Sequence, residues 1–235
     1  MNSQESLRCT GGPKALARVI TVQDAVEMIS DESTVMVGGF LGVGTPHRLM
    51  AELVRHGRRG LTVIANDTAR PNVGVGCLID HKLVRKVIVS HVGTNPETQR
   101  QMIAGEIEVE LCPQGTLVER IRAAGYGLGG VLTRTGIGTM AAEGKRVVEI
   151  DDDRFLLEMP IKADFALLGA RRADYRGNLS YFLTARNFNP VMAMAGSTVI
   201  AEPVEIVPVG VIAPDEVVTP HVLVDYLVER DLPHR

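Results

Sequence analysis

The chain has 235 residues, 45% of them hydrophobic and 23% charged, which suits one large domain with a substantial core. Its formal net charge of −3 and the near absence of lysine and arginine clusters exclude a strongly basic surface for nucleic acid or an anionic membrane. No apolar run is long enough to cross a bilayer and residues 1–18 lack a signal-peptide core, so we expect a cytoplasmic protein.

Short β-branched segments alternate with helical patterns through the first half of the chain. Four strands are predicted, at 34–39, 61–66, 86–91 and 107–112. A helix is predicted at 46–57, between Pro46 as a start and Gly57 as a stop, and others begin at Pro96 and Thr116. Strands separated by helices form βαβ units with right-handed crossovers, which require a mostly parallel sheet. The sequence therefore predicts an α/β fold.

The second half begins with a glycine-rich segment at 125–139. Residues 145–160 contain two β-rich runs around Asp151–Asp153, which predicts a hairpin with a solvated turn rather than a metal site. Apolar strands return at 164–170 and 197–210, and four prolines between positions 203 and 220 argue against a long helix there. Because no linker or repeat interrupts the pattern, we expect a single domain.

A glycine-rich loop, Gly38–Gly44, follows the first predicted strand. It lacks the dinucleotide-binding spacing, because the third position counted from Gly42 is His47. Glycine permits positive φ and close approach of a ligand, so backbone N–H groups can face a ligand oxygen. Next to a helix start, such groups suit a phosphate, a carboxylate or a developing oxyanion. A merely tight strand-to-helix turn explains the spacing equally well.

Polar side chains also follow the other predicted strands. Ligands of parallel sheets gather at the carboxyl ends of the strands, so these positions are candidate site residues. Besides the loop Gly38–Gly44, they are Asn66, Asp67, His91 and Pro113–Gly115. The three cysteines, Cys9, Cys77 and Cys112, lie far apart, without a C-x-x-C pair or a histidine at ligand spacing. Disulfides and a metal are therefore disfavoured.

From about Val19 to Val228 the chain resembles the α subunit of the family I coenzyme A transferases, which have a three-layer α/β/α fold. The resemblance is carried by "VGGFLGVGTPHRL", "LTVIANDTA", "SHVGTNPETQRQMIAGEIEVELCPQGTLVERIRAAGYGLGGVLTRTGIGT", "RGNLSYFLTARNFNP" and "PDEVVTP". The sequence around Asn66-Asp67 is most similar to the bacterial acetate or acetoacetate branch, because the animal succinyl-CoA:3-oxoacid enzymes have an Asn-Asn pair there. Residues 1–18 lie outside the resemblance as an N-terminal extension to a domain at 19–235.

The resemblance implies a ping-pong exchange of CoA between short-chain carboxylic acids through a glutamyl-CoA thioester. The family's nucleophilic Glu lies in a Ser-Glu-Asn-Gly motif, and this chain contains no Glu-Asn-Gly. We therefore expect no catalytic nucleophile in this chain and activity only with a separate β subunit, in an α2β2 assembly. CoA is a substrate in this chemistry, and no cofactor is expected.

The resemblance also assigns residues to the site. The expected CoA-binding stretch is Gly38, Gly39, Phe40, Leu41, Gly42, Val43 and Gly44. Asn66 and Gln114 match the family's Asn and Gln that line the acyl and carboxylate site. An amide suits this role because it donates to an oxyanion without becoming a competing nucleophile.

Each of these residues also has a purely structural explanation. Asn66 can cap the turn after its strand, and Gln114 can be a turn residue before the helix at Thr116. We interpret His47 and His91 as structural. Arg186 can hold a CoA phosphate or form an ion pair with an acidic neighbour.

The sequence offers other carboxylates, and it is compatible with other functions. Glu106, Glu108 and Glu110 alternate as solvent-facing strand positions do, so none is expected to be a nucleophile. One rival function is a sugar-phosphate isomerase of related architecture, which needs an acid/base pair near the glycine loop and no partner. Another is a noncatalytic subunit that only binds CoA.

Overall fold

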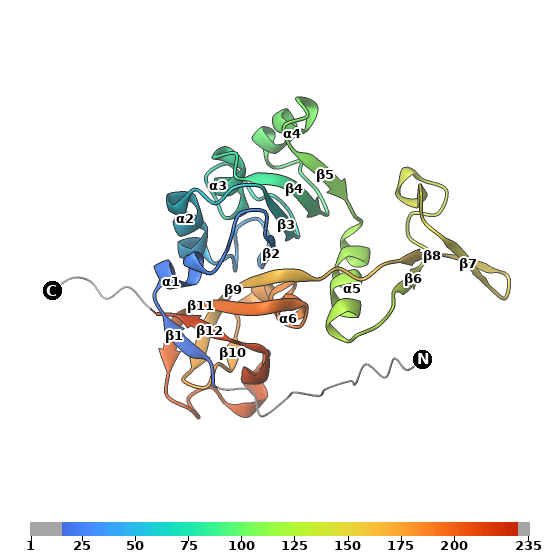
Figure 1. Cartoon of the computed structure of the whole chain (residues 1–235). Helices are drawn as coiled ribbons and strands as arrows, with labels where there is room; N and C mark the ends of the chain where they lie inside the picture. The colour runs from blue at the N-terminus through green and yellow to red at the C-terminus, as the bar shows by residue number, and fades with distance from the viewer. Residues whose placement is uncertain (1–15, 230–235) are drawn as a thin grey trace, which may run out of the picture.

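The computed structural model describes residues 16–229, which form a nine-stranded sheet covered by helices (Figure 1). Along the sheet the order is β1 (Arg18–Ile20), β12 (Tyr226–Val228), β11 (Gly196–Val207), β9 (Ala163–Asp174), β2 (Thr34–Val37), β3 (Leu61–Ala65), β4 (Val84–Val89) and β5 (Glu108–Leu111). All these neighbours pair in parallel, and only the short β10 (Leu179–Ser180) pairs antiparallel, with β9. The predicted mostly parallel sheet is confirmed.

Helices cover both faces of the sheet. On one face lie α1 (Val22–Glu27), α2 (His47–His56) and α3 (Val75–Asp80), with α4 (Pro96–Ile103) packed beside α3. On the other lie α5 (Gln114–Gly125) and the short α6 (Asn189–Met192). The three layers of the expected α/β/α fold are therefore present.

The central strands are buried on both sides, which explains their continuous apolar sequence. Successive side chains of a strand point to opposite faces. Met36 and Ile64 accordingly pack with α5 and α6, whereas Val35 and Val63 pack with α1, α2 and α3. A parallel sheet enclosed in this way requires β-branched or other apolar residues at nearly every position.

The helix boundaries follow local signals. Gly57 ends α2 in the left-handed conformation, with φ 67°, as the sequence predicts. Asn95 caps α4 by accepting hydrogen bonds from two backbone N–H groups, and Pro96 is the first helical residue. The third predicted helix begins at Gln114, two residues before Thr116, so Gln114 belongs to a helix start rather than to a turn.

Most of the predicted N-terminal extension lies outside the described residues, which begin at Leu16, and Arg18 already belongs to β1. Within residues 16–229, no helix is long and apolar enough to span a membrane, and no group of three His, Cys, Asp or Glu side chains could hold a metal ion. Cys77 and Cys112 are free thiols, and Cys9 falls outside the described part. In the proline-rich region 203–220, the one helix that the structure describes is the short 3-10 helix Pro214–Glu216.

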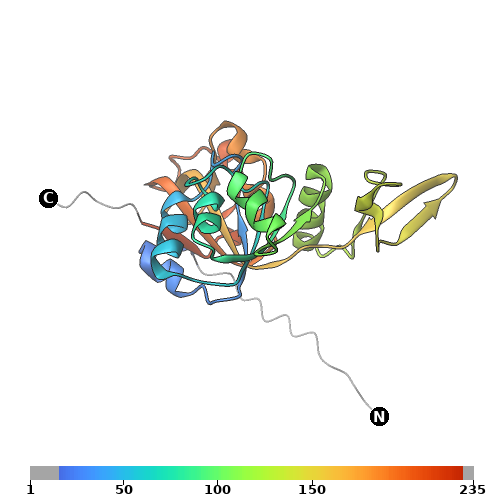
Figure 2. The same ribbon diagram turned by 90° about the horizontal axis from the view of Figure 1, so that it is seen from above.

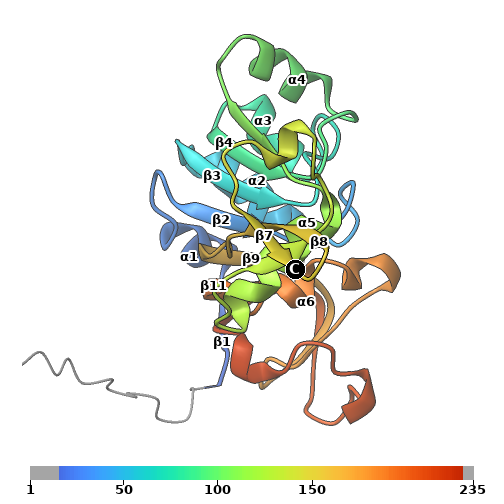
Figure 3. The ribbon, with the colours of Figure 1, turned by 90° about the vertical axis from the view of Figure 1, so that its right-hand side faces the viewer.

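A second, smaller sheet projects from the body beside α5 (Figures 2 and 3). It consists of β6 (Val131–Thr133), β7 (Val147–Ile150) and β8 (Asp153–Glu158), in the antiparallel order β6-β8-β7. We call residues 131–158 the arm. The predicted hairpin is β7–β8, and the strand β6 was not foreseen from the sequence.

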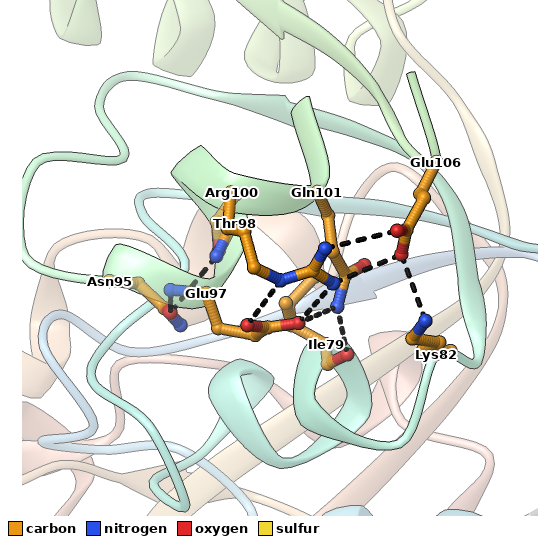
Figure 4. A network of polar contacts seen from close by, with 8 residues as sticks. All are labelled: Ile79, Lys82, Asn95, Glu97, Thr98, Arg100, Gln101 and Glu106. Atoms are coloured by element: carbon orange, nitrogen blue, oxygen red, sulfur yellow. Dashed lines mark hydrogen bonds and ion pairs between the residues drawn. The ribbon is translucent and has the colours of Figure 1, made fainter. Parts of the chain in front are cut away.

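A network of charged and amide side chains fastens α4 to the neighbouring segments (Figure 4). Arg100 donates hydrogen bonds to Glu97 and to Glu106, which lies in the turn before β5. Lys82, at the end of α3, also pairs with Glu106, at 3.0 Å. Gln101 donates to the buried carbonyl of Ile79 at 2.8 Å. The hydrogen bonds from Arg100 hold the pKa of each glutamate near 2 instead of 4.5.

The lowered pKa values predict how this network responds to acid. A carboxyl group whose pKa is depressed by folding stabilises the fold above its unfolded pKa and loses that contribution as the pH falls toward its folded value. We expect the wild-type chain to lose stability between pH 5 and pH 2 more steeply than Arg100→Gln, as measured by urea midpoints across that range. Arg122→Gln, which removes an exposed pair with Glu119 alone, is the matched control and should follow the wild-type slope. Parallel curves for wild type and Arg100→Gln would contradict this role.

Candidate functional site

The glycine loop after β2 is a closed turn held by its own backbone. Phe40 and Val43 exchange hydrogen bonds, at 3.0 and 2.8 Å. Leu41 has a φ of 50°, which is uncommon for a residue with a side chain, and its N–H donates to the Asp67 carboxylate at 3.1 Å. The Asp67 carboxylate also accepts from the N–H of Ala69 at 2.7 Å. The buried Asp67 therefore fixes the shape of the loop from the end of β3.

Packing inside the protein requires several of the loop glycines. A Cβ on Gly38 would lie 1.8 Å from Oδ1 of Asn189, and a Cβ on Gly44 would lie 2.4 Å from Cβ of Ala185. Gly42 has φ 87°, and a Cβ there would lie 2.4 Å from Cγ1 of Val73. The tight-turn explanation of these glycines is supported, whatever ligand the loop binds.

Two sets of backbone N–H groups in this region have different partners. Those of Arg48 and Leu49, at the start of α2, donate to the Glu202 carboxylate at 3.1 and 2.8 Å. Glu202 thus occupies the positive end of α2, and the N–H groups of this helix start are already engaged. Among the hydrogen bonds within residues 16–229, by contrast, none is donated by the N–H groups of Gly39, Gly42 or Gly44. A ligand oxygen would have to use these loop groups.

Asn66 and Gln114 come together at the strand ends, as expected for two site residues. Nε2 of Gln114 donates to Oδ1 of Asn66 at 2.8 Å, and the hydroxyl of Ser90 donates to the same oxygen at 3.0 Å. Asn66 is 0% exposed. Its Nδ2 group is buried and has no hydrogen-bond partner within the described residues. Leaving a buried amide donor unpaired costs about 1 to 3 kcal/mol. The unpaired Nδ2 group of Asn66 therefore indicates an acceptor supplied from outside the described residues.

The fold explains why these three side chains meet. Asn66 follows β3, Ser90 follows β4, and Gln114 begins α5 just after β5. Because β3, β4 and β5 are parallel neighbours, their carboxyl ends lie at the same edge of the sheet. The Asn66 side-chain oxygen accepts from two other side chains and not from a nearby backbone N–H, so Asn66 is not a simple turn cap.

Two hollows flank the loop. One, of about 510 Å³, is lined by Val43, Gly44, Thr45, His47, Arg48, Gly169, Ala170, Arg171, Phe182, Ala185, Glu202, Pro203 and Val204. The other, of about 470 Å³, is lined by Phe40, Gln114, Thr184, Arg186 and Asn187. The second is lined by Gln114, so it is the hollow that adjoins the Asn66–Gln114 pair.

The neighbouring charged residues have different roles. Nε2 of His47 lies 2.9 Å from the carbonyl oxygen of Gly42 within the protein, and the ring of His91 packs near Phe40, with centroids 6.4 Å apart. Both contacts are structural. Arg186 is exposed in the second hollow and forms no ion pair with another described residue, so the expected alternative of an acidic neighbour is not realised.

The glutamates before and along β5 take part in ion pairs rather than facing solvent alone. Glu106 lies before β5 and not within it, which corrects the predicted strand alternation. Lys86 pairs with Glu108 and with Glu110, at 2.8 and 3.1 Å. Burial tends to raise the pKa of Glu110, but hydrogen bonds from Arg120 and Lys86 lower it overall. None of these carboxylates lines either hollow.

Sequence reasoning missed three residues that shape the site: Ser90, Asn189 and Glu202. The side chain of Asn189 accepts from the N–H of Gly169 at 3.0 Å and donates to the carbonyls of Gly44 and Ala185. Asn189 is fully buried, and it joins the loop to β9. Ser90 lies inside the quoted "SHVGTNPET" segment, but nothing in a single sequence marks its hydroxyl as the partner of Asn66.

A parallel sheet with a buried, partly unpaired amide at its strand ends is typical of an α/β protein with a ligand site at that edge. The model of the coenzyme A transferase family matches residues 19–230. The chain belongs to this family.

Curated relatives agree with this assignment. The chain is 52% identical to the acetate CoA-transferase subunit alpha of Escherichia coli over 211 residues, 90% of this chain and 96% of that protein. It is 46% identical to the acetoacetyl-CoA:acetate/butyrate CoA transferase alpha subunit of Clostridium acetobutylicum over 214 residues, 91% of this chain and 98% of that protein. Their names as α subunits imply a partner subunit.

Solved structures share the fold. An acyl-CoA transferase from E. coli O157:H7, in a thioester complex with CoA, has a TM-score of 0.81 and 25% identity, and the match covers 92% of this chain and 47% of that one. This chain therefore spans about half the length of that structure. The decarboxylase AibA/AibB has a TM-score of 0.77 and 26% identity, over 92% of this chain and 84% of that chain.

Proposed function

We propose that this chain is the α subunit of a short-chain acyl-CoA:carboxylate CoA-transferase of the acetyl-CoA/acetoacetate or butyrate type. CoA moves between carboxylic acids in a ping-pong reaction, through a glutamyl-CoA thioester on a separate β subunit. The assembly is an α2β2 heterotetramer. Support comes from the family, from relatives whose names specify acetate, acetoacetyl-CoA and butyrate, and from the geometry at Asn66.

The observation that carries the proposal is the unpaired Nδ2 of Asn66. Gln114 and Ser90 both donate to Oδ1, so the amide is oriented with its N–H groups directed elsewhere. A carboxylate that attacks a thioester carbonyl produces a tetrahedral oxyanion. A fixed, buried donor directed at such an oxyanion is worth about 3 to 4 kcal/mol of transition-state stabilisation, because it needs no reorganisation during the reaction. We assign this role to Asn66, with Gln114 as its positioning neighbour.

We assign CoA binding to the loop from Gly38 to Gly44. Its free N–H groups, on Gly39, Gly42 and Gly44, are the donors available to an oxygen of the thioester or of the pantetheine arm. No metal or cofactor is part of this chemistry, since CoA itself is the group transferred.

The nucleophile is assigned to the partner because the nearby carboxylates of this chain are already engaged. Asp67 accepts from the N–H groups of Leu41 in the loop and of Ala69, and Glu202 accepts from two N–H groups of α2. A carboxylate held by such donors is a poor nucleophile, since its lone pairs are committed. This arrangement also argues against the isomerase alternative, which needs an unengaged acid/base pair at the loop.

Transfer of CoA from acetoacetyl-CoA to acetate is expected only when this chain is combined with its β subunit. Each chain should be purified and assayed alone and as the co-purified complex, with product acetyl-CoA measured by chromatography. Activity restricted to the complex supports the proposal that this chain supplies only part of the active site. Robust transfer by this chain alone would place the nucleophile here and overturn the proposal.

A variant of the complex distinguishes the proposed catalytic role from the noncatalytic alternative. If this chain only binds CoA, then Asn66→Ala in the assembled enzyme leaves turnover unchanged. The proposal expects a large loss of turnover with unchanged co-purification of the two subunits.

A further inference from the structure

One face of the arm carries several apolar side chains, some of them exposed. The register places Leu132 opposite Leu157 and Val148 opposite Phe155, while Ile150 lies opposite Asp153. Opposed residues of antiparallel strands, and alternate residues along one strand, point to the same side. Five apolar side chains therefore share one side of the arm, which we call the apolar arm face: Leu132, Val148, Ile150, Phe155 and Leu157.

The opposite side of the arm is covered by the chain itself. Leu156 points there and is 0% exposed. A Cβ on Gly136 would lie 3.5 Å from Cδ1 of Leu156 and 3.0 Å from Cβ of Ala141, so the connection between β6 and β7 packs over that side. On the apolar arm face, Leu132 is 42% exposed and Ile150 is 45% exposed. A sheet of three short strands needs a covered hydrophobic face to be stable, and residues 16–229 cover the apolar arm face less completely than the opposite side.

Charges of opposite sign lie at the two ends of this face. Arg146, just before β7, is exposed, and its carbonyl accepts from the N–H of Leu157, which puts it opposite Leu157 at the base of the arm. Asp151 and Asp152 form the turn at the tip and are also exposed. None of the three forms an ion pair within the described residues, whereas Arg134 lies over the Phe155 ring, 5.4 Å from its centroid, and pairs with Asp153. Base and tip are about 17 Å apart at the rise of a β-strand.

We propose that the apolar arm face docks against the same face of a second copy of this chain, with the two arms antiparallel about a two-fold axis. That orientation brings Arg146 of each copy to the acidic tip of the other and buries the five apolar side chains together. A parallel arrangement would place the two acidic tips side by side. Self-complementarity of this kind is what a two-fold interface requires, and the inference does not depend on the proposed catalytic activity.

The first test is the oligomeric state of the chain alone, measured by sedimentation at several protein concentrations. We expect a dimer that Val148→Asp weakens by at least about tenfold in Kd, because a charge replaces an apolar side chain opposite Phe155, in the middle of the face. Ile103→Asp is the matched control, since Ile103 is 83% exposed on α4, away from the arm. Circular dichroism checks that both variants are folded.

Exchanging the charges of Arg146 and Asp152 distinguishes a second copy of this chain from any other partner of the apolar arm face. Arg146→Glu should weaken the dimer, and Arg146→Glu combined with Asp152→Arg should restore it, because both contacts are reversed together in a two-fold pair. Higher salt should weaken the wild-type dimer for the same reason. A chain that is monomeric at every concentration, or a dimer unaffected by Val148→Asp, overturns the proposal. So does a Val148→Asp variant that loses only its binding to the β subunit, since that outcome assigns the face to the other chain.

Discussion

Gln114→Ala is expected to lower CoA transfer by the assembled enzyme at least tenfold, and by as much as about 10²-fold if Asn66 loses its orientation entirely. The variant removes the hydrogen bond of 2.8 Å from Nε2 of Gln114 to Oδ1 of Asn66. Gln114 is exposed at the start of α5, so its truncation should leave the fold intact. The measurement is steady-state transfer from acetoacetyl-CoA to acetate by the complex.

The kinetic parameters distinguish a catalytic effect from a structural one. If Gln114 acts by directing the Asn66 donor at the oxyanion, kcat should fall while KM for the acyl-CoA changes little. Gln114→Glu is the sharper variant, because a carboxylate beside Oδ1 of Asn66 favours rotation of that amide and diverts its N–H groups to the new oxygen. Gln23→Ala, at an exposed position on α1, is the control. Unchanged turnover in Gln114→Ala would remove Gln114 from the mechanism.

Gly38→Ala is expected to destabilise the chain by about 3 kcal/mol or more. The new Cβ would lie 1.8 Å from Oδ1 of Asn189, which is fully buried and cannot move away without breaking its own hydrogen bonds. Those bonds join Gly169, Gly44 and Ala185, so the loop, β9 and the segment before α6 loosen together. Urea unfolding at neutral pH measures the effect.

A double variant identifies the cause. Asn189→Ala removes the obstacle, so adding Gly38→Ala to it should cost much less than Gly38→Ala costs alone. Gly93→Ala is the matched control, because no heavy atom lies within 4 Å of the position its Cβ would take. Fully additive losses, or a Gly38→Ala variant as stable as wild type, would show that the close contact with Asn189 is not what requires glycine at this position.

Local sequence signals were sufficient for most of the main body. The β-branched runs, the proline at the start of α4 and the glycine after α2 each act within a few residues, and each predicted element is present. The helix α3 was missed, since its six residues are too few to show a helical period and it follows Gly74 rather than a polar cap. The predicted strand 164–170 extends to the twelve residues of β9, and the predicted strand 197–210 ends earlier, at Val207 of β11, because β9 and β11 pair with each other along their whole length.

The site was predictable only in part, for a physical reason. Asn66 and Gln114 could be named because each follows a strand, and the parallel order brings those ends together. Glu202 at the start of α2 and Asn189 beneath the loop act across 154 and 145 residues of sequence, so no local pattern reports them. From the sequence, the loop glycines could be explained by a bound ligand or by a tight turn. Their close contacts with Asn189, Ala185 and Val73 account for the tight turn.

The order of strands in the main sheet also constrains how the chain is made. The consecutive strands β2, β3, β4 and β5 are neighbours and can pair as soon as they leave the ribosome, but the other side of β2 pairs with β9, which begins at Ala163. Until more than two thirds of the chain has been synthesised, β2 is an open, apolar edge. The N-terminal β1 waits longer still, because its partner is β12, at Tyr226–Val228. A nascent chain stalled before β9 would therefore expose a strand edge suited to pairing with other chains, and shielding of that edge during translation is a requirement of this topology.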